Sequence, residues 1–480
     1  MAARSLSNES LGTLDPRVAV PTYDRGAATG RVVHFGVGGF HRAHQAVYAD
    51  DLLQRGIEDW AIVGAGVLQR DRAMRDALAG QDFLYTVVEQ SPDDRKARVV
   101  GSILDFAYAE EHADALLRRL CDPDVRIVSL TVTEGGYHYD FGRRALREDD
   151  PAIEEDRRGV SPPLTWIGFV VHALRARREA GVAPFTVMSC DNIPNNGTVA
   201  RSVVLELADD VDSTLYSFIE GSVSFPCTMV DRITPVTTSD EIRRLEEEYG
   251  LADAWPVFCE AFRQWVVEDE FPAGRPRWNE VGVQLTDDVY PYELAKIRLL
   301  NGAHSALSYA AALLGYERVD EAMKDSDVLN LVRRYMVEVK PTVPDVPGWD
   351  LNEYCDTLVR RFGNPAIADR VARLAQDGST KIANSVAPAA KDAVAQGRPV
   401  PAIAAAVAAW IAYCRDRPSV DDPAADALAD AAREGVGAFL GLDWVFPPQL
   451  AKGDGFRSEV GRALRIIDAE GMRAALKQLP

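Results

Sequence analysis

The sequence predicts an α/β protein: a doubly wound parallel sheet in residues 1–287, followed by a mostly α-helical domain in residues 288–480. In the N-terminal half, short apolar runs alternate with helical periods, which is typical of a sheet covered by helices on both faces. After about residue 287, Ala- and Leu-rich helical periods replace the strand patterns. A chain of 480 residues also exceeds the usual size of one domain, so we expect two separate cores.

Four apolar segments have the length and composition of buried parallel strands. They are RVVHFG (31–36), WAIVGAGV (60–67), VRIVSLTVTE (125–134) and FTVMSC (185–190). Helical patterns separate most of them, so the strands are expected to lie parallel with helices between them. FLYTVVEQ (83–90) and RKARVVGSI (95–103) are expected to add an antiparallel hairpin.

Composition excludes some classes of partner. Asp and Glu number 73 against 53 Lys and Arg, and the resulting net charge of -20 argues against a nucleic-acid or anionic-membrane surface. The six cysteines are scattered without a CxxC pair, which favours reduced thiols and a cytoplasmic location. The N-terminus lacks the apolar core of a secretory signal, and the longest apolar run, residues 402–414, is too short to span a bilayer.

The first predicted strand leads directly into the glycine-rich segment GVGGF. Gly36, Gly38, Gly39 and Phe40 therefore occupy a strand-to-helix turn, where bare backbone lets a pyrophosphate approach. This context indicates a dinucleotide-binding loop of a Rossmann-type domain. The motif is imperfect, because His41 stands where GxGxxG would have its third glycine, and a purely structural turn is the alternative.

The choice of dinucleotide depends on the residues after the second predicted strand. Asp71 is in the place of the acidic residue that holds the adenosine ribose hydroxyls, which favours NAD. Its neighbour Arg70 would accommodate a 2′-phosphate, so use of NADP stays open. His41 and His44 have no evident third or fourth ligand nearby, and we expect no metal.

The segment PYELAKIRLLNGAHSALSY (291–309) carries the residues best suited to catalysis. On an α-helix, Asn301 lies about 140° and His304 about 80° around the axis from Lys296, so all three can face one cleft. A neutral lysine can remove a hydroxyl proton, an amide N–H can stabilise an oxyanion, and an imidazole can hold a neighbouring hydroxyl. This set suits alcohol oxidation without a metal.

Two other interpretations of this segment stay open. In the first, Lys296 and Arg298 lie on the solvated side of an amphipathic helix. In the second, Tyr292 and Lys296 form the YxxxK signature of the short-chain dehydrogenases, with the tyrosine as the base. The position of this pair in a 480-residue chain argues against the second, because the short-chain fold ends well before it.

Several segments together resemble the polyol-specific long-chain dehydrogenases. They are HFGVGGFHRAHQAVY, VSLTVTEGGY, TVMSCDNIPNNG, SFPCTMVDRITP, EDEFP and YELAKIRLLNGAH. The resemblance runs from about residue 10 to about 385 and implies a Rossmann-type domain, a mostly helical C-terminal domain, NAD(H) dependence and no metal. It further implies a monomer that interconverts a polyol and its ketose, such as D-mannitol and D-fructose.

The resemblance also assigns roles by position. It makes Lys296 the catalytic base, Asn192 and Asn301 the amides that stabilise the oxyanion, and His304 a substrate-orienting residue. Further residues that the resemblance places against the polyol are Asp231, Glu293, Arg373 and Lys381. Independently, Asn192 follows the strand FTVMSC, at the sheet edge where ligands bind in such folds.

Structural roles compete with several of these assignments. Asn192 could shape an Asx turn, Asp231 could be a turn residue paired with Arg232, and Arg373 and Lys381 could be solvated charges. Glu134, at the end of the third predicted strand, is either part of a proton path to Lys296 or a buried structural carboxylate.

Other functions also stay open. The chain departs from the resemblance at Arg70 and after Lys381, where IANSVAP replaces a more aromatic and basic segment. A D-arabinitol-type dehydrogenase, a keto-hexuronate reductase of the fructuronate type and a nicotinamide-sensing protein without turnover are the alternatives. The reductase would need a cationic pocket for a carboxylate, which Arg373 and Lys381 would supply.

Overall fold

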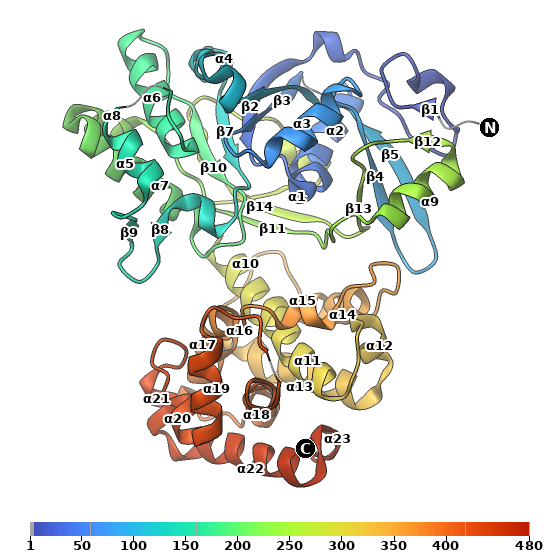
Figure 1. The fold of residues 1–480 in the computed structure, drawn as a ribbon, viewed down its shortest axis with the longest axis vertical. Helices are drawn as coiled ribbons and strands as arrows, with labels where there is room; N and C mark the ends of the chain where they lie inside the picture. The colour runs from blue at the N-terminus through green and yellow to red at the C-terminus, as the bar shows by residue number, and fades with distance from the viewer. Residues whose placement is uncertain (1–3, 58, 160–161, 418, 480) are drawn as a thin grey trace. The chain divides into compact units, whose positions relative to one another are not determined.

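The computed structural model describes residues 4–57, 59–159, 162–417 and 419–479 and divides the chain into two compact units (Figure 1). Unit 1 is Met1–Val289 and contains every strand of the described residues. Unit 2 is Tyr290–Pro480, and its described residues form helices and connecting loops. The expected succession of an α/β domain and an α-helical domain is confirmed.

A parallel sheet in the order β10-β7-β2-β3-β6 forms the centre of unit 1. Its strands are β2 (Thr29–Phe35), β3 (Trp60–Gly66), β6 (Ile103–Tyr108), β7 (Ile127–Leu130) and β10 (Thr186–Ser189). The chain runs outward from β2 through β3 and β6, then crosses back to β7 and β10 on the other side of β2. The strand order therefore reverses between β2 and β7, which is where ligands bind in doubly wound folds.

Helices cover both faces of this sheet. Adjacent residues of a strand point to opposite faces, so each strand contributes side chains to both cores. Val33 and Phe35 of β2 pack into one core with α4, α5, α6 and α7, whereas Val32 packs into the other with α1, α2 and α3. The helices of unit 1 are α1 (Gly39–Ala43), α2 (Gln45–Gln54), α3 (Asp71–Ala79), α4 (Ala109–Cys121), α5 (Pro151–Arg157), α6 (Trp166–Glu179), α7 (Asn196–Val211), α8 (Ser213–Ser222) and α9 (Ser239–Tyr249).

Smaller sheets surround the central one. The predicted hairpin is confirmed, since β4 and β5 pair antiparallel, although Ile103 belongs to β6. A further sheet, β11-β14-β15, has no counterpart in the sequence prediction. The strands of the smaller sheets are β1 (Arg4–Ser5), β4 (Tyr85–Gln90), β5 (Arg95–Val100), β8 (Tyr139–Asp140), β9 (Ala145–Leu146), β11 (Thr228–Asp231), β12 (Leu251–Ala252), β13 (Val257–Glu260), β14 (Gln264–Glu268) and β15 (Gln284–Thr286).

Unit 2 packs its helices around α11 and α18, which contact each other. Residues 402–414 of α18 are all buried, and their many alanines let neighbouring helices approach closely. The helices are α10 (Tyr290–Ala295), η5 (Lys296–Asn301), α11 (Gly302–Leu313), α12 (Val319–Lys324), α13 (Ser326–Val339), α14 (Leu351–Phe362), α15 (Val371–Ala375), α16 (Gly378–Lys381), η7 (Ile382–Val386), α17 (Ala387–Ala395), α18 (Pro401–Asp416), α19 (Ala425–Glu434), α20 (Val436–Leu440), α21 (Pro448–Lys452), α22 (Asp454–Glu470) and α23 (Met472–Lys477).

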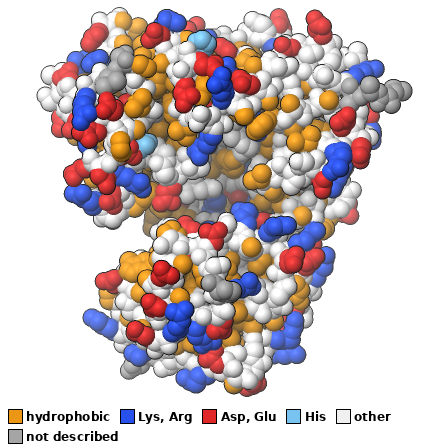
Figure 2. Space-filling model, in the orientation of Figure 1, with side chains coloured by type: hydrophobic (Ala, Val, Ile, Leu, Met, Phe, Trp, Pro, Cys, Tyr) orange, Lys and Arg blue, Asp and Glu red, His pale blue; other side chains and the backbone are white. Residues whose placement is uncertain are grey.

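The surface of the two units is mixed in character. On the face that Figure 2 shows, acidic and basic side chains are interspersed among apolar and uncharged ones. In the described part of the chain, no helix combines the length and the apolar character that crossing a bilayer demands.

A half-buried carboxylate, that of Glu338, holds the start of α18. The Oε1 and Oε2 atoms of Glu338 accept the N–H of Ala402 at 2.8 and 3.1 Å, and Oε2 also accepts the N–H of Ile403 at 2.9 Å. Burial, together with the nearby carboxylate of Glu459, raises the pKa of Glu338 to about 7. The folded protein therefore binds a proton at this site that the unfolded chain, with a glutamate pKa near 4.5, has already lost.

We predict that Glu338 makes the protein less stable as pH rises. Between about pH 4.5 and pH 7 the folded state holds more protons here than the unfolded state, so this contribution to the free energy of unfolding falls with pH. In Glu338→Gln, the Tm measured by calorimetry should drop less between pH 5 and pH 8 than in wild type, by a few degrees. Glu353→Gln, at an exposed glutamate of α14, is the control and should follow wild type. Equal Tm differences in all three proteins would contradict the prediction.

Candidate active site

Gly36 is required by the close approach of two loops at the strand-order reversal. Its φ is +88°, and a Cβ there would lie 2.1 Å from the carbonyl oxygen of Thr131, in the loop after β7. The Gly38 N–H donates to the Gly36 carbonyl at 2.6 Å. A side chain at Gly36 is therefore excluded by the protein itself, whatever ligand binds there.

Gly38 and Gly39 differ from Gly36 because the protein leaves room beside them. The nearest atom to a Cβ on Gly38 is the Gly36 carbonyl oxygen at 3.9 Å, and on Gly39 it is Cγ2 of Thr234 at 3.8 Å. Packing does not demand glycine at either position, so the bare backbone fits a loop that a dinucleotide approaches. Phe40 follows, stacked on the His44 ring at 5.0 Å between centroids.

The polar side chains of His34, Ser129 and Thr131 form hydrogen bonds that hold this loop. Burial lowers the pKa of His34 to about 3, so the ring is neutral and carries one N–H. The Thr131 hydroxyl donates its hydrogen to the Gly36 carbonyl at 2.6 Å. Its oxygen can therefore only accept from His34, so the single N–H of the ring is on Nε2, which donates to Thr131 Oγ1 at 2.8 Å. The other ring nitrogen, Nδ1, accepts from the Ser129 hydroxyl at 2.8 Å. The chain of hydrogen bonds ties β2 to β7.

The two histidines considered as a metal pair have other contacts. The His41 ring stacks on His34 with centroids 3.4 Å apart, and His44 Nε2 bonds the Gln264 carbonyl at 2.8 Å. Within the described ranges, no group of three or more His, Cys, Asp and Glu side chains is arranged to hold a metal ion.

Asp71 is the first residue of α3, just beyond β3. Its Oδ2 accepts the N–H of Leu68 at 3.1 Å, and burial raises its pKa. A Cβ on Gly66 would lie 2.9 Å from this oxygen, so the carboxylate sits against the end of β3. Arg70 beside it is exposed. The predicted contact of Asp71 with a ribose stays a prediction.

Asp191 joins the loops after β7 and β10. Its Oδ2 accepts the N–H of Val132 at 2.9 Å and the Tyr137 hydroxyl at 2.8 Å, while Oδ1 accepts the N–H of Thr133 at 2.9 Å. Burial raises the pKa of Asp191 to about 6. The sequence prediction overlooked this residue, although a carboxylate directly after a buried strand and directly before Asn192 was a usable signal.

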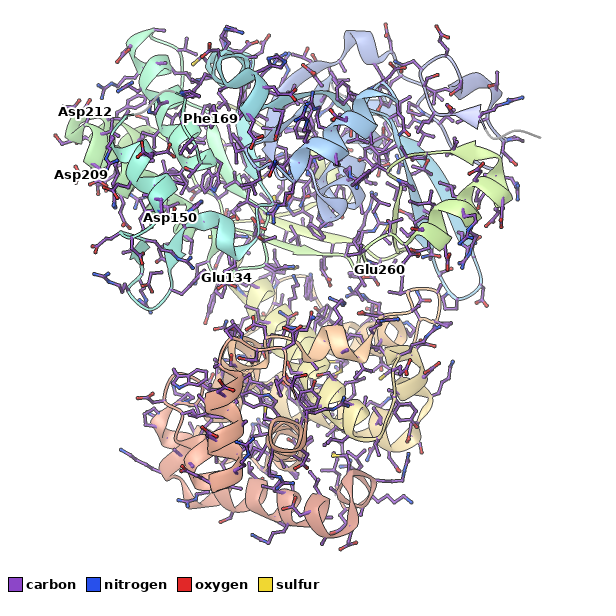
Figure 3. All side chains as sticks on the ribbon, viewed as in Figure 1. Glu134, Asp150, Phe169, Asp209, Asp212 and Glu260 are labelled. Carbon is purple, nitrogen blue, oxygen red and sulfur yellow. The ribbon has the colours of Figure 1, made fainter. Side chains whose placement is uncertain are left out.

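The neighbouring candidates lie on the same edge of the sheet. Asn192 follows Asp191 and is exposed in the loop that leads to α7. Glu134 begins the short helix η3 (Glu134–Tyr137) after β7 and is also exposed (Figure 3). The interpretation of Glu134 as a buried structural carboxylate is therefore wrong.

Asp231 is the last residue of β11 and is 6% exposed. It lies in a strand, opposite Gln264 of β14, rather than in a turn. Arg232 donates to Glu89 Oε1 at 2.6 Å and to the carbonyl of Glu260 at 3.0 Å. The interpretation of Asp231 as a turn residue is therefore wrong.

The candidate catalytic segment of unit 2 is not the regular α-helix that the sequence predicts. Residues Lys296–Asn301 form a π-helical turn, η5, between α10 and α11, and the Gly302 N–H bonds the carbonyl of Ile297, five residues back. Because such a turn closes at i→i+5, Lys296 and Asn301 stack one turn apart on one face. Lys296 and Asn301 therefore lie closer together around the helix axis than the separation of about 140° expected for an α-helix.

Tyr335 of α13 accounts for this irregularity. A Cβ on Gly302 would lie 2.0 Å from the Tyr335 hydroxyl oxygen, so only glycine fits. The hydroxyl donates to the Arg298 carbonyl at 3.3 Å, the acceptor that the Gly302 N–H would use in an α-helix. Inserting this side chain shifts the helix by one residue.

Both basic residues of the segment are buried. Lys296 and Arg298 are each 6% exposed, so the solvated-helix interpretation is wrong. Arg298 donates to the carbonyl of Thr342 at 2.5 Å and to Asp392 Oδ2 at 2.6 Å. The Tyr292 hydroxyl donates to the carbonyl of Pro347 at 2.8 Å.

Unit 2 brings the remaining candidates near this turn. Glu293 of α10 and His304 of α11 lie on the same continuous helical stretch, and the His304 ring packs 4.2 Å from that of Phe362. Lys381 precedes a second π turn, η7, which contacts η5. The Lys381 Nζ donates to the Leu374 carbonyl at 3.1 Å, and burial lowers its pKa.

Arg373 lies on α15, which packs against α11. It is exposed and forms a two-bond ion pair with Asp369, which raises the pKa of its guanidinium. The substrate contacts expected of Arg373 and Lys381 stay predictions.

A Rossmann-type sheet with an open glycine loop, followed by a helical unit with a buried lysine, defines the class of the two-domain dinucleotide-dependent dehydrogenases. Family models match nearly the whole chain: the mannitol dehydrogenase Rossmann domain at residues 30–280 and the mannitol dehydrogenase C-terminal domain at residues 288–468. The chain belongs to the mannitol dehydrogenase family. The short-chain dehydrogenase interpretation is therefore wrong.

Individual relatives agree over their full length. A mannitol 2-dehydrogenase of Cereibacter sphaeroides is 44% identical, with 96% of this chain and 98% of the relative covered. The solved ternary complex of Pseudomonas fluorescens mannitol 2-dehydrogenase with NAD and D-mannitol is 42% identical, with a TM-score of 0.88 and 99% of each chain covered. A D-sorbitol dehydrogenase in substrate-free form is 36% identical, with a TM-score of 0.92 and 98% and 100% covered.

We predict that replacing Gly36 lowers the stability of the protein, whereas replacing Gly38 weakens dinucleotide binding. Gly36→Ala should prevent stable folding or lower the Tm by more than about 10 °C, because a backbone oxygen blocks its Cβ at positive φ. Gly38→Ala should keep the wild-type Tm within about 2 °C, yet weaken NADH binding roughly tenfold or more, because its methyl group occupies ligand space. Thermal melts and NADH fluorescence titration measure both. Unchanged NADH affinity in Gly38→Ala would contradict the cofactor role of this loop.

Proposed function

We propose that this protein is an NAD-dependent polyol dehydrogenase that interconverts D-mannitol and D-fructose without a metal. The observation that carries the proposal is the buried Lys296 on a π turn with Asn301, in a chain 42% identical to a mannitol 2-dehydrogenase that binds NAD and D-mannitol. Titratable groups buried next to polar donors are typical of active sites, and so are π turns.

In this proposal Lys296 is the general base. Burial disfavours the charged form of an amine, so a lysine that is 6% exposed is suited to accept a proton. It takes the proton of the substrate hydroxyl as the alcohol is oxidised and returns it to the ketone oxygen in the reverse direction. Arg298, held by Asp392 and by the Thr342 carbonyl, keeps a fixed positive charge two residues away.

The amides of Asn192 and Asn301 donate to the same substrate oxygen and stabilise its partial negative charge. His304, Glu293, Asp231, Arg373 and Lys381 orient the remaining hydroxyls. Gly36, Gly38, Gly39, Phe40 and Asp71 hold the dinucleotide, which when bound supplies the acceptor for the hydride of the substrate carbon.

Other substrates and a second dinucleotide have support as alternatives. The D-sorbitol dehydrogenase of TM-score 0.92 supports D-sorbitol as a second candidate substrate. A keto-hexuronate remains an alternative because Arg373 and Lys381 are cationic, although Arg373 already pairs with Asp369. We infer NAD as cofactor because Asp71 follows β3, and exposed Arg70 keeps NADP as the alternative.

We further propose that the enzyme is a cytoplasmic monomer. None of the six cysteines, all of which lie within the described residues, forms a disulfide, which suits a reducing compartment. Light scattering after size-exclusion chromatography tests the assembly state, for which a mass near 52.6 kDa is expected.

We predict that the purified protein oxidises D-mannitol with NAD. A panel of mannitol, arabinitol, sorbitol, fructose and fructuronate, each with NAD(H) and NADP(H), is followed by absorbance of the reduced nicotinamide. We expect mannitol and fructose to give the highest kcat/KM, with NAD preferred. A clear preference for fructuronate would identify the reductase alternative, and dinucleotide binding with no turnover on the whole panel would favour a sensing protein.

We predict that Lys296→Ala lowers kcat for mannitol oxidation by a factor of hundreds or more, as expected for loss of a positioned base. Its NADH affinity should remain within about twofold of wild type, because the glycine loop belongs to unit 1 and Lys296 belongs to unit 2. Tyr292→Phe is the matched control and should keep most activity. Turnover near wild type in Lys296→Ala would contradict the assignment of the base.

A further inference from the structure

We propose that Asp191 is a positioning residue, which fixes the loop that carries Asn192 and so aims the amide of Asn192 at the reacting oxygen. The inference rests on the proposed function. Asp191 takes no part in the proton and hydride transfers of the proposed reaction.

Asp191 connects two loops that follow neighbouring parallel strands. β7 and β10 are paired in register up to Leu130 and Ser189, and both chains leave the sheet directly afterwards. The two oxygens of Asp191 then accept the successive N–H groups of Val132 and Thr133, each at 2.9 Å. The carboxylate of Asp191 thus links the two loops beyond the point where the pairing of β7 with β10 ends.

The main chain of Asp191 is held as firmly as its side chain. The Asn196 Nδ2 donates to the Asp191 carbonyl at 3.0 Å and to the Thr228 carbonyl at 2.9 Å, while the Asn196 Oδ1 accepts the Thr228 N–H at 2.9 Å. With both ends of Asp191 fixed, the direction in which the chain continues into Asn192 is fixed too.

The partner loop needs such a tie because it is strained. Thr133 has a φ of +65°, a conformation that a β-branched residue adopts only when its surroundings impose it. The Tyr137 hydroxyl adds a third donor to Asp191 and also bonds Ser189 Oγ, at the end of β10. A carboxylate can accept all three bonds, whereas an asparagine amide turns one acceptor into a donor that faces other donors.

A second buried carboxylate provides a matched control. Asp253 is 3% exposed and accepts the N–H of Thr86 at 2.5 Å, the N–H of Trp255 at 2.8 Å and Gln81 Nε2 at 3.0 Å. It has the same bonding as Asp191, two backbone amides and one side chain, but it ties β4 rather than the end of the central sheet. Loss of either carboxylate should lower the Tm.

The first measurement separates these two sites. At a temperature well below both melting points, Asp191→Asn should lower kcat for mannitol oxidation by about 10- to 100-fold, the cost of a slightly misplaced donor. Asp253→Asn should lose a comparable amount of Tm while kcat stays within about twofold of wild type.

The decisive measurement is a double-mutant cycle with Asn192→Ala. If Asp191 acts through Asn192, then the doubly substituted Asp191→Asn, Asn192→Ala protein has a kcat within about twofold of Asn192→Ala alone. In the doubly substituted Asp253→Asn, Asn192→Ala protein, the fold-loss of kcat should instead equal the product of the losses in the two single variants. A product relation for the Asp191 pair would overturn the inference, because a general structural role gives independent effects.

A milder variant keeps the test informative if Asp191→Asn does not fold. Tyr137→Phe removes one donor to Asp191 and should lower kcat several-fold, again without a further loss beside Asn192→Ala. An active wild type whose Tyr137→Phe and Asp191→Asn variants differ only in Tm would overturn this inference alone. A wild type that is inactive on the whole substrate panel would overturn the proposed function together with it.

Discussion

The structure of unit 1 depends on how polar main-chain groups find partners where the parallel strands end. Inside the sheet each N–H and carbonyl pairs with a neighbouring strand, but at the carboxyl edge that pairing stops and unpaired buried groups would be costly. The Gly36 carbonyl is satisfied by the Gly38 N–H and the Thr131 hydroxyl. The amides of Val132 and Thr133 are satisfied by Asp191. These bonds turn loops into fixed platforms, which is what a site for a dinucleotide and a small substrate requires.

Unit 2 follows the same rule inside a helix. The π turn η5 leaves the Arg298 carbonyl, which the Gly302 N–H would have reached in an α-helix, and the Tyr335 hydroxyl donates to this carbonyl instead. The two π turns pack against each other, so the irregularities that place Lys296 and Lys381 are in contact. Regular α-helix at either position would rotate the following residues away.

Strand patterns were predictable where burial was complete and the run was continuous. β3, β7 and β10 fall within the expected segments, and β2 overlaps its segment but begins earlier, at Thr29. Both sheet faces are covered, which gives the unbroken apolar runs that made these strands recognisable. β6 was overlooked because Asp105 interrupts it and it follows the hairpin without a clear boundary. β11, β14 and β15 are short and distant in sequence, so their pairing is decided by tertiary contacts and leaves no local pattern.

The residue types of the candidate site stand out in the sequence, but their arrangement in the structure does not. Lys296 and Asn301 stand out as residue types, yet their angular relation depends on Tyr335, a residue of another helix that no local rule connects to Gly302. The position of Asp191 directly after a buried strand was a usable signal, but its bonds to Val132 and Thr133 depend on the loop after another strand, which no local pattern predicts. Ile382–Val386, where the chain departs from the sequence resemblance, is the π turn η7, and it packs on η5, which carries Lys296. A difference in that segment therefore changes the packing against the turn that carries Lys296.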